Sequence, residues 1–163
     1  MKIQITINDE PVLIDVKPDT PLVWVLRRQN LLSPKCGCGE GRCGACTVLL
    51  NDYPVPSCLV PAAAVRDARI VTLEHFAKTV VYADIQQGFS QAGVRFCGFC
   101  NAGKIFAAYE LLRRTEKADR AQVIEELSAF SCQCADVSRT ANGILIALNI
   151  RRRRENKEKE PPK

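Results

Sequence analysis

Eight of the nine cysteines in this 163-residue chain fall into two groups of four. The first group has the spacing C-x4-C-x2-C-x11-C and the second has the spacing C-x2-C-x31-C-x-C. The first group comprises Cys38, Cys43, Cys46 and Cys58, and the second comprises Cys97, Cys100, Cys132 and Cys134. Four thiolates can converge on a metal ion or on a small metal cluster, so the fold must close around each group.

The spacing of each group distinguishes between two kinds of metal centre. The first group opens with the C-x4-C-x2-C run that binds a [2Fe-2S] cluster in plant-type ferredoxins. C-x2-C pairs also bind structural zinc, but zinc sites usually combine two similar short pairs. Neither the first run nor the close C-x-C of Cys132 and Cys134 has that form. The spacing therefore favours an iron–sulfur cluster at each group, with a zinc-stabilised interaction module as the alternative.

The length of the chain suits two small domains. Each cysteine group occupies its own half, and a metal core can replace part of the apolar core that so short a unit lacks. The chain opens with the alternating run 2–7 rather than an apolar leader, and no run has the length of a membrane span. We therefore expect a cytoplasmic protein that keeps its thiols reduced for metal binding, with no membrane partner.

The net charge of +5 includes a basic run at residues 151–154, which could suggest nucleic-acid binding. The residues that follow, 155–163, alternate in sign and offer no aromatic side chain for stacking on bases. We therefore predict a charged, disordered tail over residues 152–163 and no nucleic-acid partner.

The first half has the pattern of a β-grasp fold. Alternating runs at 2–7 and 11–16 predict a β-hairpin. Thr20-Pro21 is typical of a helix start, and a glycine-rich loop then carries the first three cysteines. Strands are expected at 47–50 and 69–73. Strand, strand, helix, loop, strand, strand is the order of a β-grasp ferredoxin.

The second half has helical periodicity. Apolar residues at helical spacing predict four helices, which contain Ile85, Ile105, Val123 and Ile144. Cysteines at helix ends would place anionic sulfur near N–H dipoles. The expected class is thus α+β, with a β-grasp plant-type ferredoxin domain at residues 1–75 and a four-helix bundle [2Fe-2S] domain at 76–151.

Three motifs carry a resemblance to a known family. They are KCGCGEGRCGACTV at 35–48, SCL at 57–59 and CGFC at 97–100. Together they resemble the small iron–sulfur subunit of molybdenum hydroxylases, the xanthine dehydrogenase and aldehyde oxidoreductase family. The resemblance covers about residues 1–150.

The resemblance implies an electron-transfer role. One [2Fe-2S] cluster would be bound in the N-terminal domain by the first cysteine group, and another in the helical domain by the second. A separate large subunit would hold a molybdenum pterin centre that hydroxylates the substrate with oxygen from water. Electrons would pass through both clusters to a subunit that carries FAD. The chain would then be a non-catalytic part of a hetero-oligomeric oxidoreductase.

The second half departs from the usual family motifs at several positions. The family usually has a glutamine before Cys-Gly-x-Cys and Thr-Pro-Gly after it, where this chain has Phe96 and Asn101-Ala102-Gly103. Cys-Arg-Cys-Thr-Gly-Tyr is replaced by a sequence with Gln133 and Ala135-Asp136-Val137. In the family, that glutamine lies against the pterin. An alternative therefore stays open, in which the chain serves another redox complex that lacks the standard molybdenum pterin site.

Five further residues have ordinary expected roles. Cys36 is expected to be a spare thiol, and His75 a surface or packing residue. Arg42 and Lys104 are expected to face solvent, and Trp24 to lie in the core or at a subunit contact.

Overall fold

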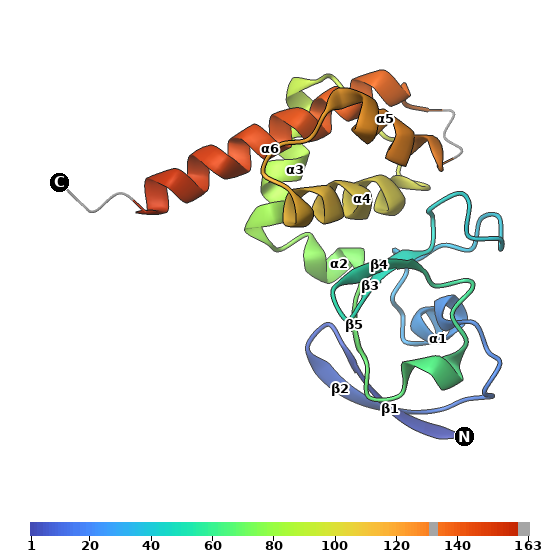
Figure 1. Cartoon of the computed structure of the whole chain (residues 1–163). Coiled ribbons are helices and arrows are strands. Elements are labelled where there is room, and N and C mark those ends of the chain that lie inside the picture. The colour runs from blue at the N-terminus through green and yellow to red at the C-terminus, as the bar shows by residue number, and fades with distance from the viewer. Residues whose placement is uncertain (131–133, 160–163) are drawn as a thin grey trace.

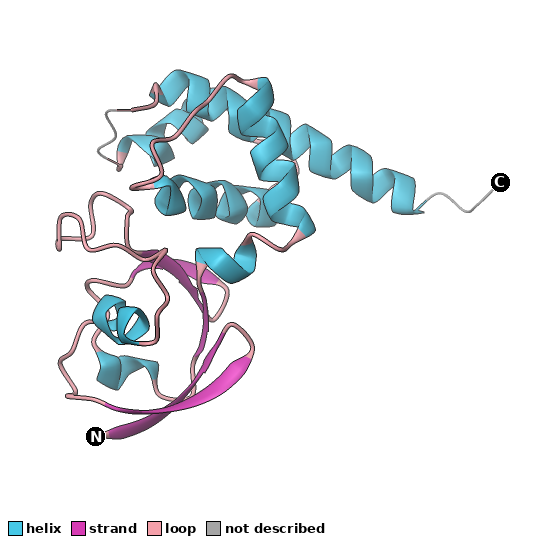
Figure 2. Ribbon diagram, turned by 180° about the vertical axis from the view of Figure 1, so that it is seen from behind, coloured by secondary structure: helices cyan, strands magenta, loops and turns pink. Residues whose placement is uncertain are grey.

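The computed structural model describes residues 1–130 and 134–159. The chain forms a part with a β-sheet and a part made of helices, which lie against each other (Figure 1). The view from behind shows the same two layers, with long loops on the side where they meet (Figure 2). These loops matter because they carry cysteines from both groups.

Within the described residues, five strands form one sheet in the order β2-β1-β5-β3-β4. The strands are β1 (Lys2–Ile7), β2 (Glu10–Asp15), β3 (Thr47–Leu50), β4 (Tyr53–Pro56) and β5 (Arg69–Val71). β1 pairs antiparallel with β2 and parallel with β5. The hairpin turn uses Asn8 and Asp9 at positive φ, which these residue types tolerate better than most. The predicted hairpin is thus confirmed.

β4 is absent from the sequence prediction. It follows the turn at Asn51 and Asp52, and it contains Pro54 and Pro56. Proline cannot donate to a strand ladder, so prolines argue against a strand except at an edge. β4 is one of the two edge strands of the sheet, which is why the two prolines are accommodated.

The sheet part has its own apolar core. Ile3, Ile5 and Ile7 alternate along β1 toward this core, where they meet the buried face of α1 (Leu22–Arg28). A short 3-10 helix, η1 (Ala62–Val65), closes another side of it. The period of two in β1 and the buried stripe of α1 therefore fix which faces turn inward.

The helical part contains the four predicted helices and one short extra helix. They are α3 (Val80–Gln91), α4 (Asn101–Arg114), α5 (Arg120–Ser128) and α6 (Val137–Lys159), preceded by α2 (Leu73–Phe76). Phe106, Ile105, Leu111 and Ile144 are among the fully buried side chains of this core. No helix in the described ranges is both long enough and apolar enough to cross a membrane.

The two parts share an apolar boundary. Leu49 of β3 and Val71 of β5 belong to the core of the helical part, and α4 packs against β3 and β4. The guanidinium carbon of Arg113 lies 4.4 Å from the centre of the Tyr53 ring. The helical part, through α4, therefore packs directly against the β-sheet.

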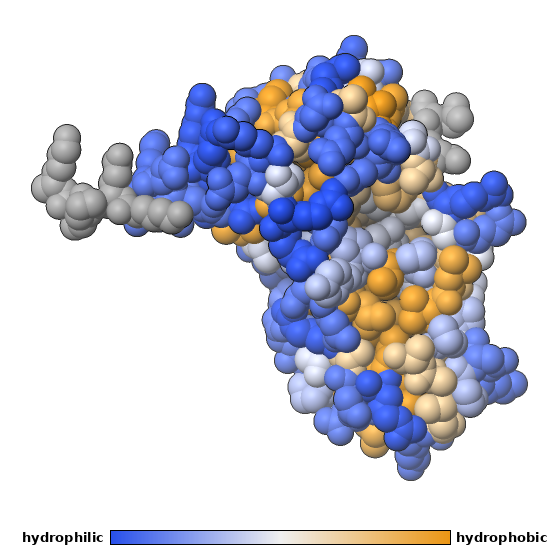
Figure 3. Space-filling model, in the orientation of Figure 1, coloured by the Kyte–Doolittle hydropathy of each residue, from blue (hydrophilic) through white to orange (hydrophobic). Residues whose placement is uncertain are grey.

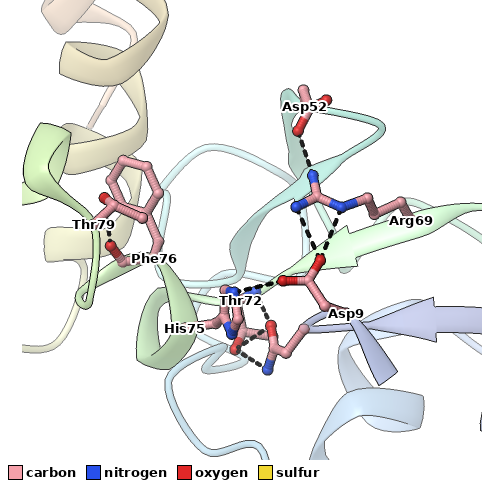
Figure 4. A network of polar contacts seen from close by, with 8 residues as sticks. Asp9, Asp52, Arg69, Thr72, His75, Phe76 and Thr79 are labelled. Atoms are coloured by element: carbon pink, nitrogen blue, oxygen red, sulfur yellow. Dashed lines mark hydrogen bonds and ion pairs between the residues drawn. The ribbon is translucent and has the colours of Figure 1, made fainter. Parts of the chain in front are cut away.

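A polar network stabilises the end of the sheet from which α2 leaves (Figure 4). Arg69 donates to Asp9 at 3.1 Å and to Asp52 at 2.6 Å. His75 Nε2 lies 2.9 Å from Asp9 Oδ2, and the backbone N–H of Thr72 donates to the side chain of Asn8. His75 is therefore a partly exposed member of this polar network, in agreement with the surface or packing role that was expected of it.

The charged C-terminal segment differs from the predicted disordered tail. α6 continues through Lys159, eight residues beyond the expected boundary at 151. Arg154 pairs with the buried Asp84 of α3 at 2.9 Å, and Arg151 pairs with Glu155 one turn along. These ion pairs stabilise the last turns of α6, where the apolar periodicity of the sequence has already ended. Its projecting end is hydrophilic, whereas apolar residues gather over the sheet part (Figure 3).

Candidate metal centres

The first cysteine group lies on two loops of the sheet part. Cys38, Cys43 and Cys46 occupy the loop between α1 and β3, and Cys58 follows β4. Gly39 and Gly41 adopt φ values of 71° and 74°, a region that favours glycine. These turns keep the loop compact enough to direct several backbone N–H groups at sulfur.

Backbone donors converge on the Cys38 sulfur. Its Sγ accepts from the N–H groups of Glu40 and Arg42 at 3.3 Å and from that of Cys43 at 3.4 Å. The bonds from Glu40 and Cys43 are the main causes that lower the pKa of Cys38 to about 6. Ala45 donates similarly to the Cys43 sulfur at 3.4 Å. The loop thus stabilises thiolate in the way that cluster-binding loops require.

The four thiols of the first group are close enough to affect one another. The Cys43 side chain contributes to the lowered pKa of Cys38, and the Cys46 side chain contributes to the raised pKa of Cys58. Burial, followed by the bond to Cys46, raises the pKa of Cys58 to about 11. A deprotonated thiol at Cys58 therefore needs a positive partner, such as a bound metal.

The four thiols of this group fit the donor set of a [2Fe-2S] cluster. A [2Fe-2S] cluster needs two thiolates at each of its irons. The four thiols, with backbone N–H donors at Cys38 and Cys43, provide that donor set.

The contrast between Cys38 and Cys58 predicts a difference in reactivity in the cluster-free chain. The thiolate is the nucleophile, so a lowered pKa makes a cysteine reactive at lower pH. Cys38 should react with iodoacetamide with a midpoint near pH 6, whereas Cys58 should stay largely unreactive below about pH 10. Mass spectrometry of digested protein across a pH series would measure both. Equal rates at the two sites at pH 7 would contradict the described loop.

The second cysteine group lies at helix ends. Cys100 is the N-cap residue of α4, and Cys97 lies three residues before it in the preceding loop. The N–H of Cys97 donates to the sulfur of Cys134, which lies just before α6, at 3.5 Å. Cys132 and Gln133 lie outside the described residues. The structure therefore brings together Cys97, from the segment before α4, and Cys134, from the segment before α6.

Lys104 is buried, although we expected it to face solvent. It is 3% exposed, and its Nζ donates to the sulfur of Cys100 at 2.9 Å. The two residues are four apart in the first turns of α4, a spacing that puts side chains on one face. That spacing could have indicated the contact, but it does not reveal that the face is buried.

The loops that carry the two groups touch each other. A Cβ added to Gly103 would lie 2.8 Å from the Cα of Gly44, so the two backbones are in contact there. Nearby, Lys35 Nζ donates to the carbonyl oxygen of Gly98 at 3.2 Å. The two candidate metal centres are therefore joined by direct contact between their loops.

The remaining singled-out residues are peripheral or packed. Cys36 is exposed, and exposed Arg42 pairs with Glu40. Trp24 is 45% exposed on α1. Of its two expected roles, the core position is therefore wrong, and the subunit contact stays a prediction. Phe96, which replaces the usual family glutamine, is half-buried and packs edge-on against Phe89 with ring centres 5.1 Å apart.

Comparisons with known proteins agree with this geometry. Residues 5–71 match a 2Fe-2S iron–sulfur cluster binding domain, and residues 72–145 match a [2Fe-2S] binding domain. One of the nicotinate dehydrogenase subunits of Pseudomonas putida is 36% identical over 93% of this chain and 97% of its own length. The xanthine dehydrogenase iron–sulfur-binding subunit of Escherichia coli O157:H7 is 37% identical over 88% of this chain and 91% of its own.

A solved structure gives the same result for the fold. A chain of quinoline 2-oxidoreductase from Pseudomonas putida 86 superposes with a TM-score of 0.82 at 31% identity. The match covers 93% of this chain and 96% of that one. The α+β class and the presence of two [2Fe-2S] binding domains are thus confirmed. The chain belongs to the family of small iron–sulfur subunits of molybdenum hydroxylases.

Proposed function

We propose that this chain carries electrons from a partner's molybdenum pterin centre through two [2Fe-2S] clusters toward a partner subunit with FAD. A bound [2Fe-2S] cluster accepts and releases one electron at a time. The chain's own residues hold the clusters, direct N–H groups at sulfur and keep the two sites adjacent. The observation that carries the proposal is the contact between Gly44, in the first cysteine-bearing loop, and Gly103, in the first turn of α4 just after Cys100.

We assign the ligands by position. The first cluster is held by Cys38, Cys43, Cys46 and Cys58, whose thiols are close enough to shift one another's pKa values. The second is held by Cys97, Cys100, Cys132 and Cys134, of which Cys132 is assigned from the sequence motif alone. Residues 1–75 and 76–151 serve as the two cluster-binding domains, and the apolar core of the second also takes in Leu49 and Val71 of the first.

A reducing compartment suits this assignment. The five cysteines of the sheet part are free thiols, which are typical of cytosolic rather than secreted proteins. We therefore place the complex in the cytoplasm.

One observation favours a second candidate for the partner. Phe96 stands where the family usually has a pterin-facing glutamine, and it packs against Phe89 within this chain. A phenyl ring cannot supply the amide hydrogen bond. The second candidate is therefore a redox partner without the standard pterin arrangement, and it leaves both clusters in place.

The composition of the native complex separates the candidates. We expect about four irons and about four acid-labile sulfides per copy of this chain, together with about one molybdenum and flavin. The same iron and sulfide without molybdenum would support the second candidate. Zinc in place of iron, without sulfide, would contradict both.

A further inference from the structure

Lys104 combines a charge with nearly complete burial beside a proposed cluster ligand. Its Nζ lies 2.9 Å from the sulfur of Cys100 and 3.5 Å from the carbonyl oxygen of the same residue. The ammonium group also lies over the ring of Phe96, 5.9 Å from its centre. Phe96 is itself held against Phe89. The ammonium is therefore positioned by an aromatic ring and aimed at sulfur.

This location is unfavourable for a lysine unless it has negative partners. Lysine is almost never fully buried without a partner. Lys104 also lies in the first turns of α4, where the helix dipole disfavours positive charge. A thiolate at Cys100 offsets both costs, because it supplies a negative charge at hydrogen-bond distance. Lys104 is thus in direct contact with the sulfur of a proposed cluster ligand.

We propose that Lys104 raises the reduction potential of the second cluster through its hydrogen bond to the Cys100 sulfur. This inference rests on the proposed function, because it requires a cluster at the second cysteine group. Reduction adds negative charge, which a buried ammonium stabilises more strongly than it stabilises the oxidised state. Hydrogen bonds to sulfur and net charge are known determinants of iron–sulfur potentials. Lys104 therefore makes this cluster a better electron acceptor.

The test is a redox titration of the full-length chain, monitored by electron paramagnetic resonance (EPR). Lys104→Met removes the charge but keeps an apolar side chain of similar length. We expect its second cluster to have a lower potential, with the ratio of reduced to oxidised cluster falling at least tenfold at a fixed potential. For a one-electron couple this is a shift of about 59 mV or more. Lys104→Arg should retain most of the wild-type potential, because it keeps a charged donor.

Two controls make the result decisive. The potential of the first cluster should not change in either variant, and a Cys46→Ala background identifies the signal of the second cluster. An unchanged second potential in Lys104→Met, with the cluster assembled, would overturn the inference. Loss of the second cluster in both Lys104→Met and Lys104→Gln would also overturn it, because Lys104 would then serve assembly. A wild-type chain without a second cluster would instead contradict the proposed function.

Discussion

Replacing Cys46 with alanine is expected to remove the first cluster and leave the second. Iron should fall from about four to about two per chain, and acid-labile sulfide should fall in parallel. Cys46 is 2% exposed and linked to Cys58, so alanine fits the site without offering a donor. The second group should keep its iron, because it lies in the other part of the chain. Metal analysis and the EPR spectrum of the reduced chain would measure both effects.

Cys36 provides a matched control in the same loop. It is exposed and precedes Cys38 by two residues, so Cys36→Ala should leave iron and sulfide at wild-type levels. The double variant Cys36→Ala/Cys46→Ala tests whether Cys36 can substitute for the lost thiol. Full iron content in that double variant, or loss of iron in Cys36→Ala alone, would refute the assignment of the first group.

Gly88→Ala is expected to destabilise the helical part by about 1–3 kcal/mol or more. An added Cβ would lie 2.4 Å from the carbonyl oxygen of Gly143 and 2.7 Å from the amide nitrogen of Ala147. Both contacts are with backbone of α6, so relief requires α3 and α6 to separate. In an open helix position the same substitution would stabilise by about 1 kcal/mol. The sign of the change therefore tests the close crossing of these helices.

Thermal unfolding followed by circular dichroism would measure the effect. For a chain of this size we expect the midpoint to fall by about 3–10 °C in Gly88→Ala. Gln87→Ala, at the neighbouring exposed position of α3, should leave the midpoint nearly unchanged. A midpoint for Gly88→Ala at or above that of the wild type would show that α3 and α6 do not approach this closely.

Local sequence signals were sufficient for most of the fold. Alternation in β1 and helical spacing around Ile85 and Ile105 predicted elements that the structure contains. They failed where tertiary context overrides local preference. β4 was missed because Pro54 and Pro56 are tolerated only at a sheet edge, and edge position is set by the whole sheet. The end of α6 was missed because Arg154 finds its partner Asp84 on another helix.

The candidate metal centres, like the fold, could be predicted only in part from the sequence. Cysteine spacing is the basis on which the proposed ligands are grouped, and three ligands of the first group lie in one short stretch of the chain. The contact between Gly44 and Gly103 and the burial of Lys104 depend on how the two parts pack. Spacing does not encode that packing. Only the structure therefore reveals that Gly44 contacts Gly103 and that Lys104 lies beside Cys100.

The most direct test of two clusters in one chain is spin quantitation of the full-length protein after reduction with dithionite. We expect two distinguishable [2Fe-2S] signals that integrate to about two spins per chain, with about four irons and about four sulfides. A colourless protein that contains zinc, lacks acid-labile sulfide and gives no signal would contradict the presence of two clusters.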